Sequence, residues 1–162
     1  MNKVYTAYYN SPIGWLKINT TQRAVTSITF CKNGNENPEI QPTILTKCIT
    51  QLNEYFAGTR HDFNISILPD GSEFQQKIWN LVQQIPYGKT TSYLNLAIKS
   101  GSAKNTRAVG MANGKNPLPI IVPCHRVIGS NGKLIGYAGG MEKKRWLILH
   151  EQAHSQQAQT LF

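Results

Sequence analysis

A cysteine, a histidine and an arginine follow one another at Cys124, His125 and Arg126, directly after Pro123 and the apolar run at 120–122. Cysteine attacks electrophiles only as its thiolate, so its surroundings decide whether it is reactive. The two basic neighbours would supply positive potential, and a helical turn opened by Pro123 would add a dipole that lowers the pKa of Cys124. The alternative is a small, inert thiol that is buried after a strand.

The 162-residue chain has the composition of a soluble globular protein, with 40% hydrophobic residues and a mean hydropathy of -0.34. Its length allows one domain, or a small domain joined to a medium one. The apolar runs are too short to span a bilayer, and the N-terminus lacks the apolar core of a signal peptide. Cys31, Cys48 and Cys124 form no CxxC pair, which argues against a disulfide framework or a zinc knuckle. We therefore expect a cytoplasmic protein without membrane association.

Positive charge is concentrated in the half of the chain that carries Cys124. Residues 1–70 contain six Lys/Arg and five Asp/Glu, a net charge of +1, whereas residues 71–162 contain eleven and three, a net charge of +8. A polyanionic partner explains such a field, with nucleic acid favoured over an acidic membrane. A solvated basic surface without a partner is the alternative.

The first 70 residues predict a small α+β module. Short β-forming runs separated by turns indicate an antiparallel meander, with strands at 4–9, 15–19 and 24–30. Apolar residues over 44–56 fall on one helical stripe that includes Cys48, which is therefore expected in the core. The alternation over 63–68 predicts a fourth strand.

The rest of the chain predicts mostly helices. A capping-box pattern at Ser72 begins a first helix, and a second runs through Tyr93 to Gly101. Ser102 would cap a third helix. The second and third form a helix-turn-helix pattern, and polar and basic residues at 104–107 lie where a recognition helix meets DNA.

Three prolines after Asn116 exclude a continuous helix and predict an extended apolar segment that leads to Cys124. A glycine-rich loop at 136–140 precedes a closing helix over 141–151, and the polar residues 152–162 are expected to be poorly ordered. The predicted fold class is α+β. It has an antiparallel-sheet domain over 1–70, a mostly helical domain over 71–155 that holds the helix-turn-helix and the active-site cysteine, and a tail over 156–162.

Several ordered motifs resemble those of the O6-alkylguanine-DNA alkyltransferases, also called methylated-DNA–protein-cysteine methyltransferases. They are Ser-Tyr at 92–93, Arg-Ala-Val-Gly at 107–110, Asn-Pro at 116–117, Pro-Cys-His-Arg-Val at 123–127 and Gly-Tyr-Ala-Gly-Gly at 136–140. The match runs without evident gaps from Phe74 to Glu151. It is weaker over residues 3–68, where Ser-Pro-Ile-Gly at 11–14 and Glu-Tyr-Phe-Ala-Gly at 54–58 resemble the family's ribonuclease H-like N-terminal domain.

The resemblance implies a DNA repair protein that binds double-stranded DNA through the minor groove and flips an O6-alkylated guanine out of the duplex. The alkyl group then moves irreversibly to Cys124, and O4-alkylthymine would react less well. No cofactor is expected, because the substrate brings the alkyl group. The zinc ligands of some relatives have no counterpart among Cys31, Cys48 and His61, so no metal is expected. We expect a monomer, with cooperative binding to DNA left open.

The resemblance also assigns catalytic roles. Alkyl transfer requires a thiolate, and His125, too close in sequence to face Cys124, would take its proton through one water. Glu151 would orient His125, as in a hydrolase triad. Tyr93 would donate to the departing guanine, and Lys144 would lie near its O6 atom. Outside the family context, Tyr93 would be a core-edge aromatic, and Lys144 and Glu151 would be solvated helix residues.

A further set of residues would contact the DNA and the flipped base. Arg107 would enter the base stack in place of the flipped nucleotide. Ala138 stands where some relatives have a serine, so a hydroxyl contact to the leaving oxygen is lost and the preference among alkyl groups should change. The other expected contacts are Ser92, Ala108, Asn116, Arg126, Tyr137 and Gly139.

Other classes of protein stay open. A non-enzymatic, alkyltransferase-like protein would bind flipped bases without an acceptor cysteine, so the presence of Cys124 argues against it. A cysteine hydrolase built on Cys124 and His125 would have poor geometry. A plain helix-turn-helix regulator would leave residues 123–126 unexplained.

Overall fold

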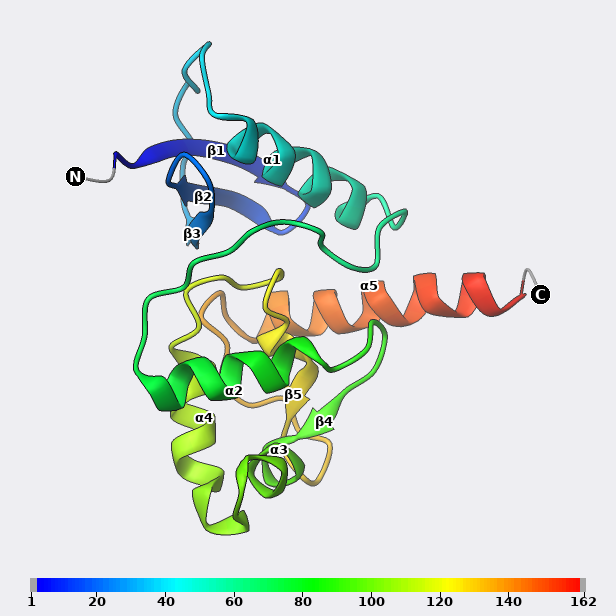
Figure 1. The fold of residues 1–162 in the computed structure, drawn as a ribbon. Helices are drawn as coiled ribbons and strands as arrows, with labels where there is room; N and C mark the ends of the chain where they lie inside the picture. Colours follow the sequence, from blue (N-terminus) through cyan, green and yellow to red (C-terminus); the bar gives the residue numbers. More distant parts are fainter. Residues whose placement is uncertain (1–2, 161–162) are drawn as a thin grey trace. The chain divides into compact units, whose positions relative to one another are not determined.

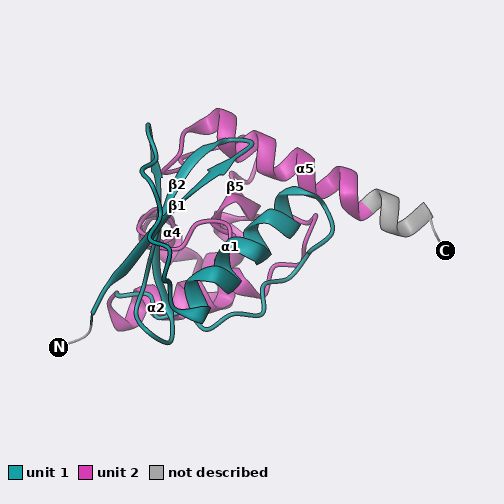
Figure 2. Cartoon of the chain, turned by 90° about the horizontal axis from the view of Figure 1, so that it is seen from above, with its two compact units in different colours: residues 1–70 teal, residues 71–162 magenta. Residues whose placement is uncertain are grey.

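The structure is a computed structural model that describes the backbone of residues 3–160 and the side chains of residues 3–155. The chain forms two compact units, residues 1–70 and residues 71–162 (Figures 1 and 2). Each unit buries apolar side chains of its own. Within the described part of the chain, no helix is long and apolar enough to cross a membrane.

Unit 1 is a three-stranded antiparallel sheet packed against one helix (Figure 1). Strands β1 (Tyr5–Ser11), β2 (Gly14–Thr20) and β3 (Val25–Cys31) pair in the order β1-β2-β3. Alternate residues of β2 are buried, and the apolar stripe of α1 (Thr43–Phe56) packs on the sheet. Cys48 is fully buried there, and burial raises its pKa to about 12, so it is an inert core residue. The predicted meander, helix and core cysteine are confirmed.

The predicted strand over residues 63–68 does not form. Ile67 makes only an isolated parallel bridge with Val25 of β3. At Asn64 a side chain satisfies the backbone instead: the Gln51 amide donates to the Asn64 carbonyl at 2.9 Å and accepts from its N–H at 3.0 Å. A glutamine amide offers a donor and an acceptor, as a strand does, so the backbone is paired without a fourth strand.

Unit 2 is built from helices around Trp79. The helices α2 (Glu73–Gln83), α3 (Tyr93–Ser100) and α4 (Thr106–Gly114) contact one another. Trp79 is 1% exposed, and its indole N–H donates to the Ala112 carbonyl of α4 at 2.8 Å. This hydrogen bond satisfies the polar atom of the largest side chain in the unit's core.

The predicted helix-turn-helix is confirmed in α3 and α4, but its turn is capped differently from the prediction. Gly101, with a φ of 133°, ends α3 in a conformation that favours glycine. Ser102 then accepts from the Lys104 N–H at 3.2 Å and caps a 3₁₀ turn, η1 (Ala103–Asn105), rather than α4 itself. A tight corner therefore precedes α4.

A short pair of parallel strands, which was not predicted from the sequence, joins the helix-turn-helix to the segment that carries Cys124. The strand β4 (Thr91–Ser92) pairs with β5 (Val127–Ile128). Since β4 directly precedes Tyr93 and β5 directly follows the 3₁₀ turn η2 (Cys124–Arg126), the pairing brings the start of α3 next to the cysteine.

The closing helix α5 (Met141–Thr160) packs against η2. It is about two and a half turns longer than predicted, because residues 152–160, expected to be poorly ordered, continue the helix. These residues include no glycine or proline that would stop it. The end of the predicted tail, residues 161–162, lies outside the described residues.

Replacing Ser72 with alanine should destabilise unit 2. The Ser72 hydroxyl accepts from the Gln75 N–H at 3.1 Å, and the Gln75 side chain accepts from the Ser72 N–H at 2.9 Å. Loss of such a cap costs about 1 kcal/mol, so the urea midpoint should fall. The control is Ser130→Ala, since Ser130 is exposed and makes no side-chain hydrogen bond among the described residues. Equal midpoints for the two variants would contradict the expectation.

Candidate active site

Cys124 lies on the wall of a cavity of about 290 Å³ in unit 2. Pockets that bind small molecules have volumes from roughly 300 Å³ upward. This cavity is at the small end of that range, so it suits a single group the size of a nucleic-acid base. The predicted site residues Tyr93, Asn116, Tyr137 and Ala138 lie on the same wall. The full lining is Tyr93, Gly110, Asn113, Gly114, Asn116, Pro119, Cys124, Gly136, Tyr137 and Ala138.

Two consecutive turns present Cys124. Pro123, with φ -79° and ψ 63°, is the centre of an inverse γ-turn in which the Cys124 N–H donates to the Val122 carbonyl at 2.7 Å. The Pro123 carbonyl then accepts from the Arg126 N–H at 2.9 Å and closes η2. Because the proline ring restricts φ near this value, the local sequence itself favours the turn. A helical turn that starts at Pro123, considered above as a condition for a lower Cys124 pKa, is therefore present.

The pKa of the Cys124 thiol is raised, whereas its basic neighbours suggested that it would be lowered. Burial is the main cause, and a hydrogen bond with Asn116, the charge of Lys144 and backbone hydrogen bonding offset it only in part. The side chains of its two neighbours in sequence, His125 and Arg126, both bind the Glu151 carboxylate instead. Cys124 is therefore a protonated thiol at rest.

The carboxylate of Glu151, on α5, binds both basic neighbours of Cys124. Its Oε2 lies 2.6 Å from His125 Nε2 and 3.1 Å from Arg126 Nη2, while its Oε1 accepts from Arg126 Nε at 2.8 Å and from the Gly88 N–H at 3.2 Å. Burial alone would raise the pKa of Glu151. The hydrogen bonds and charges of His125 and Arg126 outweigh that effect and hold the pKa well below its usual range. The carboxylate is thus ionised at neutral pH.

His125 is fully buried and neutral. Burial lowers its pKa, and the hydrogen bond to Glu151 opposes that shift without cancelling it. With an ionised acceptor at Nε2, the single proton of the ring sits on Nε2, and Nδ1 is the basic nitrogen. Nδ1 is buried and has no hydrogen-bond partner within the described part of the chain. The ring therefore presents a free acceptor for a proton.

Arg126 does not line the cavity, contrary to the expectation that it contacts substrate or DNA. It is 5% exposed, its Nη1 donates to the Ile85 carbonyl at 2.6 Å, and its guanidinium lies 5.6 Å from the centre of the Tyr87 ring. Its two contacts to Glu151 make a forked pair, which suits a guanidinium and a carboxylate. Arg126 is the buried counterion of Glu151.

Lys144 is also fully buried, so the surface-helix interpretation of this residue is wrong. Its ammonium donates to the carbonyls of Val127 at 2.7 Å, Ile135 at 2.8 Å and Gly136 at 3.2 Å. Burial lowers its pKa to about 8, against a raising effect of Cys124. Lys144 therefore anchors the glycine-rich loop and supplies positive charge that favours the thiolate.

The Tyr93 hydroxyl is engaged within the site. It donates to the Ile135 carbonyl at 2.9 Å, the same oxygen that Lys144 binds, and lies 3.4 Å from the Lys144 ammonium. Burial is the main cause that raises the Tyr93 pKa, so the hydroxyl keeps its proton. A donation to a bound base would replace its bond to Ile135.

The segment before Cys124 is turned, whereas its prolines predicted an extended chain. The Asn116 amide donates to the Val122 carbonyl and accepts from the Leu118 N–H, both at 2.9 Å. Between them Ile120 has a φ of 76°, which a β-branched residue rarely adopts. Because the Asn116 side chain satisfies the backbone across this turn, it holds the strained conformation in place.

Sequence reasoning missed Asn113. It is 4% exposed, lines the cavity, and its amide donates to the Cys124 carbonyl at 3.2 Å. The sequence contains one signal for it: a polar residue four positions after the core residue Val109 of α4, on the buried face of that helix. Asn113 thus ties α4 to the turn that carries Cys124.

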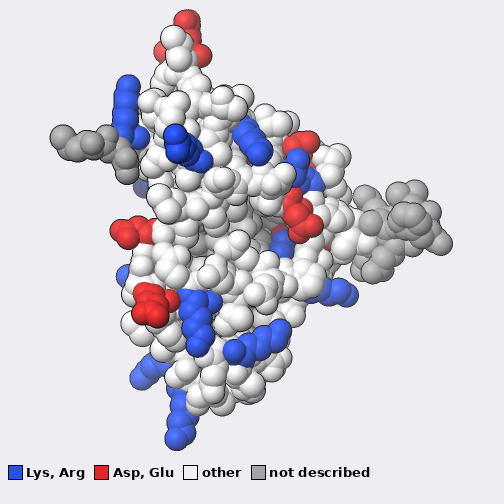
Figure 3. All heavy atoms as spheres, viewed as in Figure 1, with Lys and Arg blue, Asp and Glu red and all other residues white. Residues whose placement is uncertain are grey.

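The remaining predicted contacts lie outside the cavity. Arg107 and Ala108 are exposed near the start of α4, and Figure 3 shows Lys and Arg side chains over the part of unit 2 where α3 and α4 lie. Ser92 caps α3 by accepting from the Asn95 N–H at 2.9 Å. Gly139 is half-buried in the glycine-rich loop.

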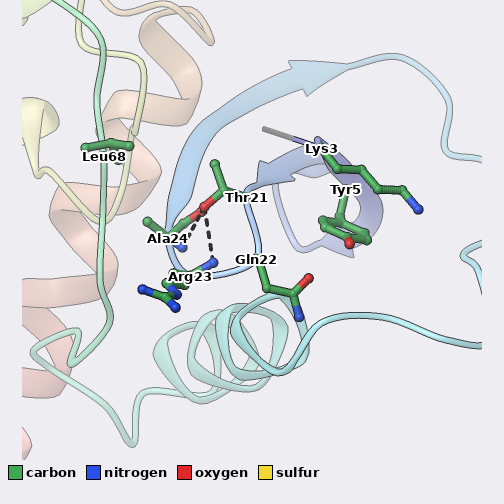
Figure 4. A pocket seen from close by; sticks show the side chains of 7 residues that line it. All are labelled: Lys3, Tyr5, Thr21, Gln22, Arg23, Ala24 and Leu68. Atoms are coloured by element: carbon green, nitrogen blue, oxygen red, sulfur yellow. Dashed lines mark hydrogen bonds between the residues drawn. The ribbon is translucent and has the colours of Figure 1, made fainter. Parts of the chain in front are cut away.

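A larger cavity of about 500 Å³ in unit 1 carries no comparable chemistry (Figure 4). The Thr21 hydroxyl on its wall accepts from the backbone N–H groups of Arg23 and Ala24, each at 3.1 Å. Figure 4 shows Lys3 and Arg23 pointing away from each other, so their charges do not converge on one ligand. Among the described residues, no three metal-binding side chains are grouped in either unit. The lining is Lys3, Tyr5, Thr21, Gln22, Arg23, Ala24 and Leu68.

Comparison with known proteins decides the family. Residues 4–69 match the ribonuclease-like domain, and residues 73–153 the DNA-binding domain, of 6-O-methylguanine DNA methyltransferases. The chain belongs to this family. It is 40% identical over 151 residues to the methylated-DNA–protein-cysteine methyltransferase of Methanosarcina acetivorans, covering 90% of this chain and 96% of that protein. The constitutive enzyme of Bacillus subtilis is 40% identical over 158 residues, covering 93% and 94%.

Solved structures of the methyltransferase family agree with the fold. The O6-methylguanine methyltransferase of Mycobacterium tuberculosis aligns with a TM-score of 0.84 and 39% identity over 94% of each chain. Its complex with DNA aligns equally well, with a TM-score of 0.84 over 93% of this chain and 94% of that one. The predicted family and the predicted α+β fold are confirmed.

Replacing Glu151 with glutamine should reduce stability and flatten its dependence on acid. Since the folded carboxylate has a lower pKa than the unfolded one, Glu151 contributes stability above about pH 4.3 and loses it as the pH falls further. Breaking the buried pair should cost about 3 kcal/mol or more at neutral pH. The measurement is urea unfolding at a series of pH values.

The control is Glu142→Gln, because Glu142 is exposed in the first turn of α5. It should leave both the midpoint and the acid limb unchanged. An acid limb of Glu151→Gln as steep as that of the parent protein would show that this carboxylate is not the group that titrates.

Proposed function

We propose that the protein repairs double-stranded DNA by moving the alkyl group of O6-alkylguanine, and less readily that of O4-alkylthymine, onto Cys124. The observation that carries the proposal is a cysteine on the wall of a base-sized cavity, next to a buried histidine–carboxylate pair, in a member of the methyltransferase family. The names of the relatives describe methyl transfer to a protein cysteine, and one solved relative is bound to DNA. The protein acts in the cytoplasm as a monomer.

The reaction is an in-line displacement at the alkyl carbon. The Cys124 thiolate forms a sulfur–carbon bond with its electron pair while the bond from that carbon to O6 breaks. The electron pair of the broken bond stays on the guanine, which takes up a proton. Because the thioether that results has no group to remove it, each molecule reacts once.

His125 receives the thiol proton through one bridging water. Its basic Nδ1 is the acceptor, and Glu151 stabilises the imidazolium that forms, since its carboxylate already binds Nε2 at 2.6 Å. The charge of Lys144 favours the thiolate as it develops. Burial thus keeps Cys124 protonated until a substrate fills the cavity and the proton leaves.

Recognition of the base uses the wall of the cavity. The Tyr93 hydroxyl exchanges its bond to the Ile135 carbonyl for the guanine ring and donates to it as it departs. Tyr137 and Asn116 shape the wall, and Ala138 leaves the O6 side without a hydroxyl. Backbone N–H groups of the glycine-rich loop contact the leaving oxygen in place of a hydroxyl. This difference alters the preference among alkyl groups.

DNA binds to the basic surface around α3 and α4, through the minor groove. Arg107 is exposed near the start of α4, where its side chain can enter the stack that the flipped nucleotide leaves. Ala108, Ser92 and Gly139 contact the strands nearby. Flipping costs a few kcal/mol, least for a damaged and poorly paired base, so extrusion already selects the lesion.

Incubation with an oligonucleotide duplex that contains O6-methylguanine should add one methyl group to Cys124. Intact mass spectrometry and peptide mapping measure its amount and position, and the reaction should stop at one group per protein. Cys124→Ala should bind the duplex without being methylated. The matched control is Cys31→Ser. Because Cys31 lies in unit 1, this variant should transfer the methyl group as the parent protein does. An unmodified protein that still binds the lesion would favour the non-enzymatic class.

Replacing Arg107 with alanine should slow repair of duplex DNA more than reaction with a free O6-alkylguanine base. Loss of the group that fills the stack raises the cost of extrusion, and 1.4 kcal/mol would slow the duplex reaction about tenfold. Single-turnover rates on the two substrates measure the difference. Arg145→Ala, an exposed arginine of α5, is the control. Equal losses of rate on both substrates would show that Arg107 does not act in base flipping.

A further inference from the structure

The segment that links α2 to β4 touches the Glu151 carboxylate through backbone alone. The Gly88 N–H donates to Glu151 Oε1 at 3.2 Å, the oxygen that also accepts from Arg126 Nε. The carboxylate is therefore held at its two oxygens by groups from different segments of unit 2, and His125 binds the oxygen that Gly88 leaves open. Any shift of this link moves a donor away from the carboxylate that orients His125.

Glycine is required at position 88 for two separate reasons. Its φ is +76°, a conformation that other residues adopt at a cost. A Cβ atom would also lie 2.5 Å from Ser155 Oγ and 2.9 Å from Ser155 Cβ, where no room remains. The Ser155 side chain is held in place, since its hydroxyl donates to the Gln152 carbonyl at 3.1 Å.

The packing of Ser155 on Gly88 gives α5 a second role, in addition to carrying the Glu151 carboxylate. Ser155 is four positions after Glu151, so both lie on the same face of the helix and meet the link at Gly88. The turn of α5 from 151 to 155 thus packs directly on the Gly88 backbone. A side chain at position 88 would push the link and the helix apart and lengthen the hydrogen bond to Glu151.

We propose that Gly88 is a positioning residue for the alkyl-transfer relay, and that its close packing against Ser155 keeps its N–H on the Glu151 carboxylate. The proposal rests on the proposed function for its effect on rate, but not for its effect on His125. With one donor fewer, the carboxylate is more strongly negative, so it binds the imidazolium more tightly and should raise the pKa of His125. The other charged groups that face His125 are Arg126 of its own turn, which also donates to the Ile85 carbonyl of the same link, and Lys144 of α5.

The experiment compares Gly88→Ala with the double variant Gly88→Ala/Ser155→Gly. Gly88→Ala should slow methyl transfer from the O6-methylguanine duplex on the order of tenfold, since small displacements of a catalytic group cost up to about 10²-fold. Affinity for the duplex should not change. Ser155→Gly alone should have little effect, and in the double variant it should recover most of the lost rate by removing the clash.

Two further variants separate strain and folding from positioning. Gly132→Ala is the strain control, because Gly132 has a φ of +80° and a Cβ there would meet nothing within 4 Å. It should transfer at the parent rate. Ser155→Val enlarges the same contact from the helix side without strain at position 88, and it should repeat the defect if Gly88→Ala does not fold.

Titration of His125 by NMR, without DNA, tests the proposal independently of methyl transfer. In Gly88→Ala or Ser155→Val the imidazole should titrate at higher pH than in the parent protein, and the double variant should return toward the parent. An unchanged titration, or a rate loss that Ser155→Gly does not relieve, would overturn the proposal. A parent protein that fails to methylate Cys124 would overturn the proposed function alone, because the titration still decides the role of Gly88.

Discussion

Moving a carboxylate from water into a protein interior costs several kcal/mol unless hydrogen-bond donors replace its hydration. At Glu151 the replacement comes from the turn after Cys124, which supplies His125 and Arg126, and from the Gly88 backbone. The hydrogen bonds to this one carboxylate therefore join α5 to η2 and to the segment between α2 and β4. The same arrangement supplies the proton acceptor of the proposed reaction, because the ionised carboxylate holds His125 with a basic nitrogen that no described residue occupies.

A second buried charge organises the other side of the cavity. Lys144 binds the Val127 carbonyl of β5 and the Ile135 and Gly136 carbonyls at the start of the glycine-rich loop, and Tyr93 shares the Ile135 carbonyl. Since a buried ammonium is costly without acceptors, these carbonyls hold the loop close to α5. Both buried charges come from one helix, so a single element sets the positions of the loop and of the imidazole.

The raised pKa of Cys124 suits an acceptor that is used once. A thiol that is permanently ionised reacts with any electrophile or oxidant that reaches it, whereas a buried, protonated thiol does not. In the proposed mechanism, removal of the thiol proton through His125 makes reactivity depend on an occupied cavity. In the proposed mechanism, reactivity comes from proton transfer to His125 and from the charge of Lys144, and not from a positive field of His125 and Arg126 on the resting thiol.

Much of the architecture could be predicted from local patterns. Hydrophobic periodicity located the meander and the helices, the capping box began α2, and Pro123 predicted the turn that presents Cys124. Ordered motifs identified the family and placed Tyr93 and Cys124 on one cavity. Two segments were predicted wrongly, residues 63–68 as a strand from their alternation and the segment before Cys124 as extended from its prolines. In both, a side-chain amide, of Gln51 or of Asn116, satisfies backbone groups, and no local pattern indicates this.

Residue patterns were thus enough to predict the fold class, the cysteine proposed as the alkyl acceptor and the basic character of the half of the chain that holds it. The directions in which the buried charged side chains point are visible only in the folded protein. Arg126 is adjacent to Cys124 in sequence, yet it is turned away from the cavity as the counterion of Glu151. The physical reason is that a buried charge takes its position from partners distant in the chain, and no local pattern of residues specifies them.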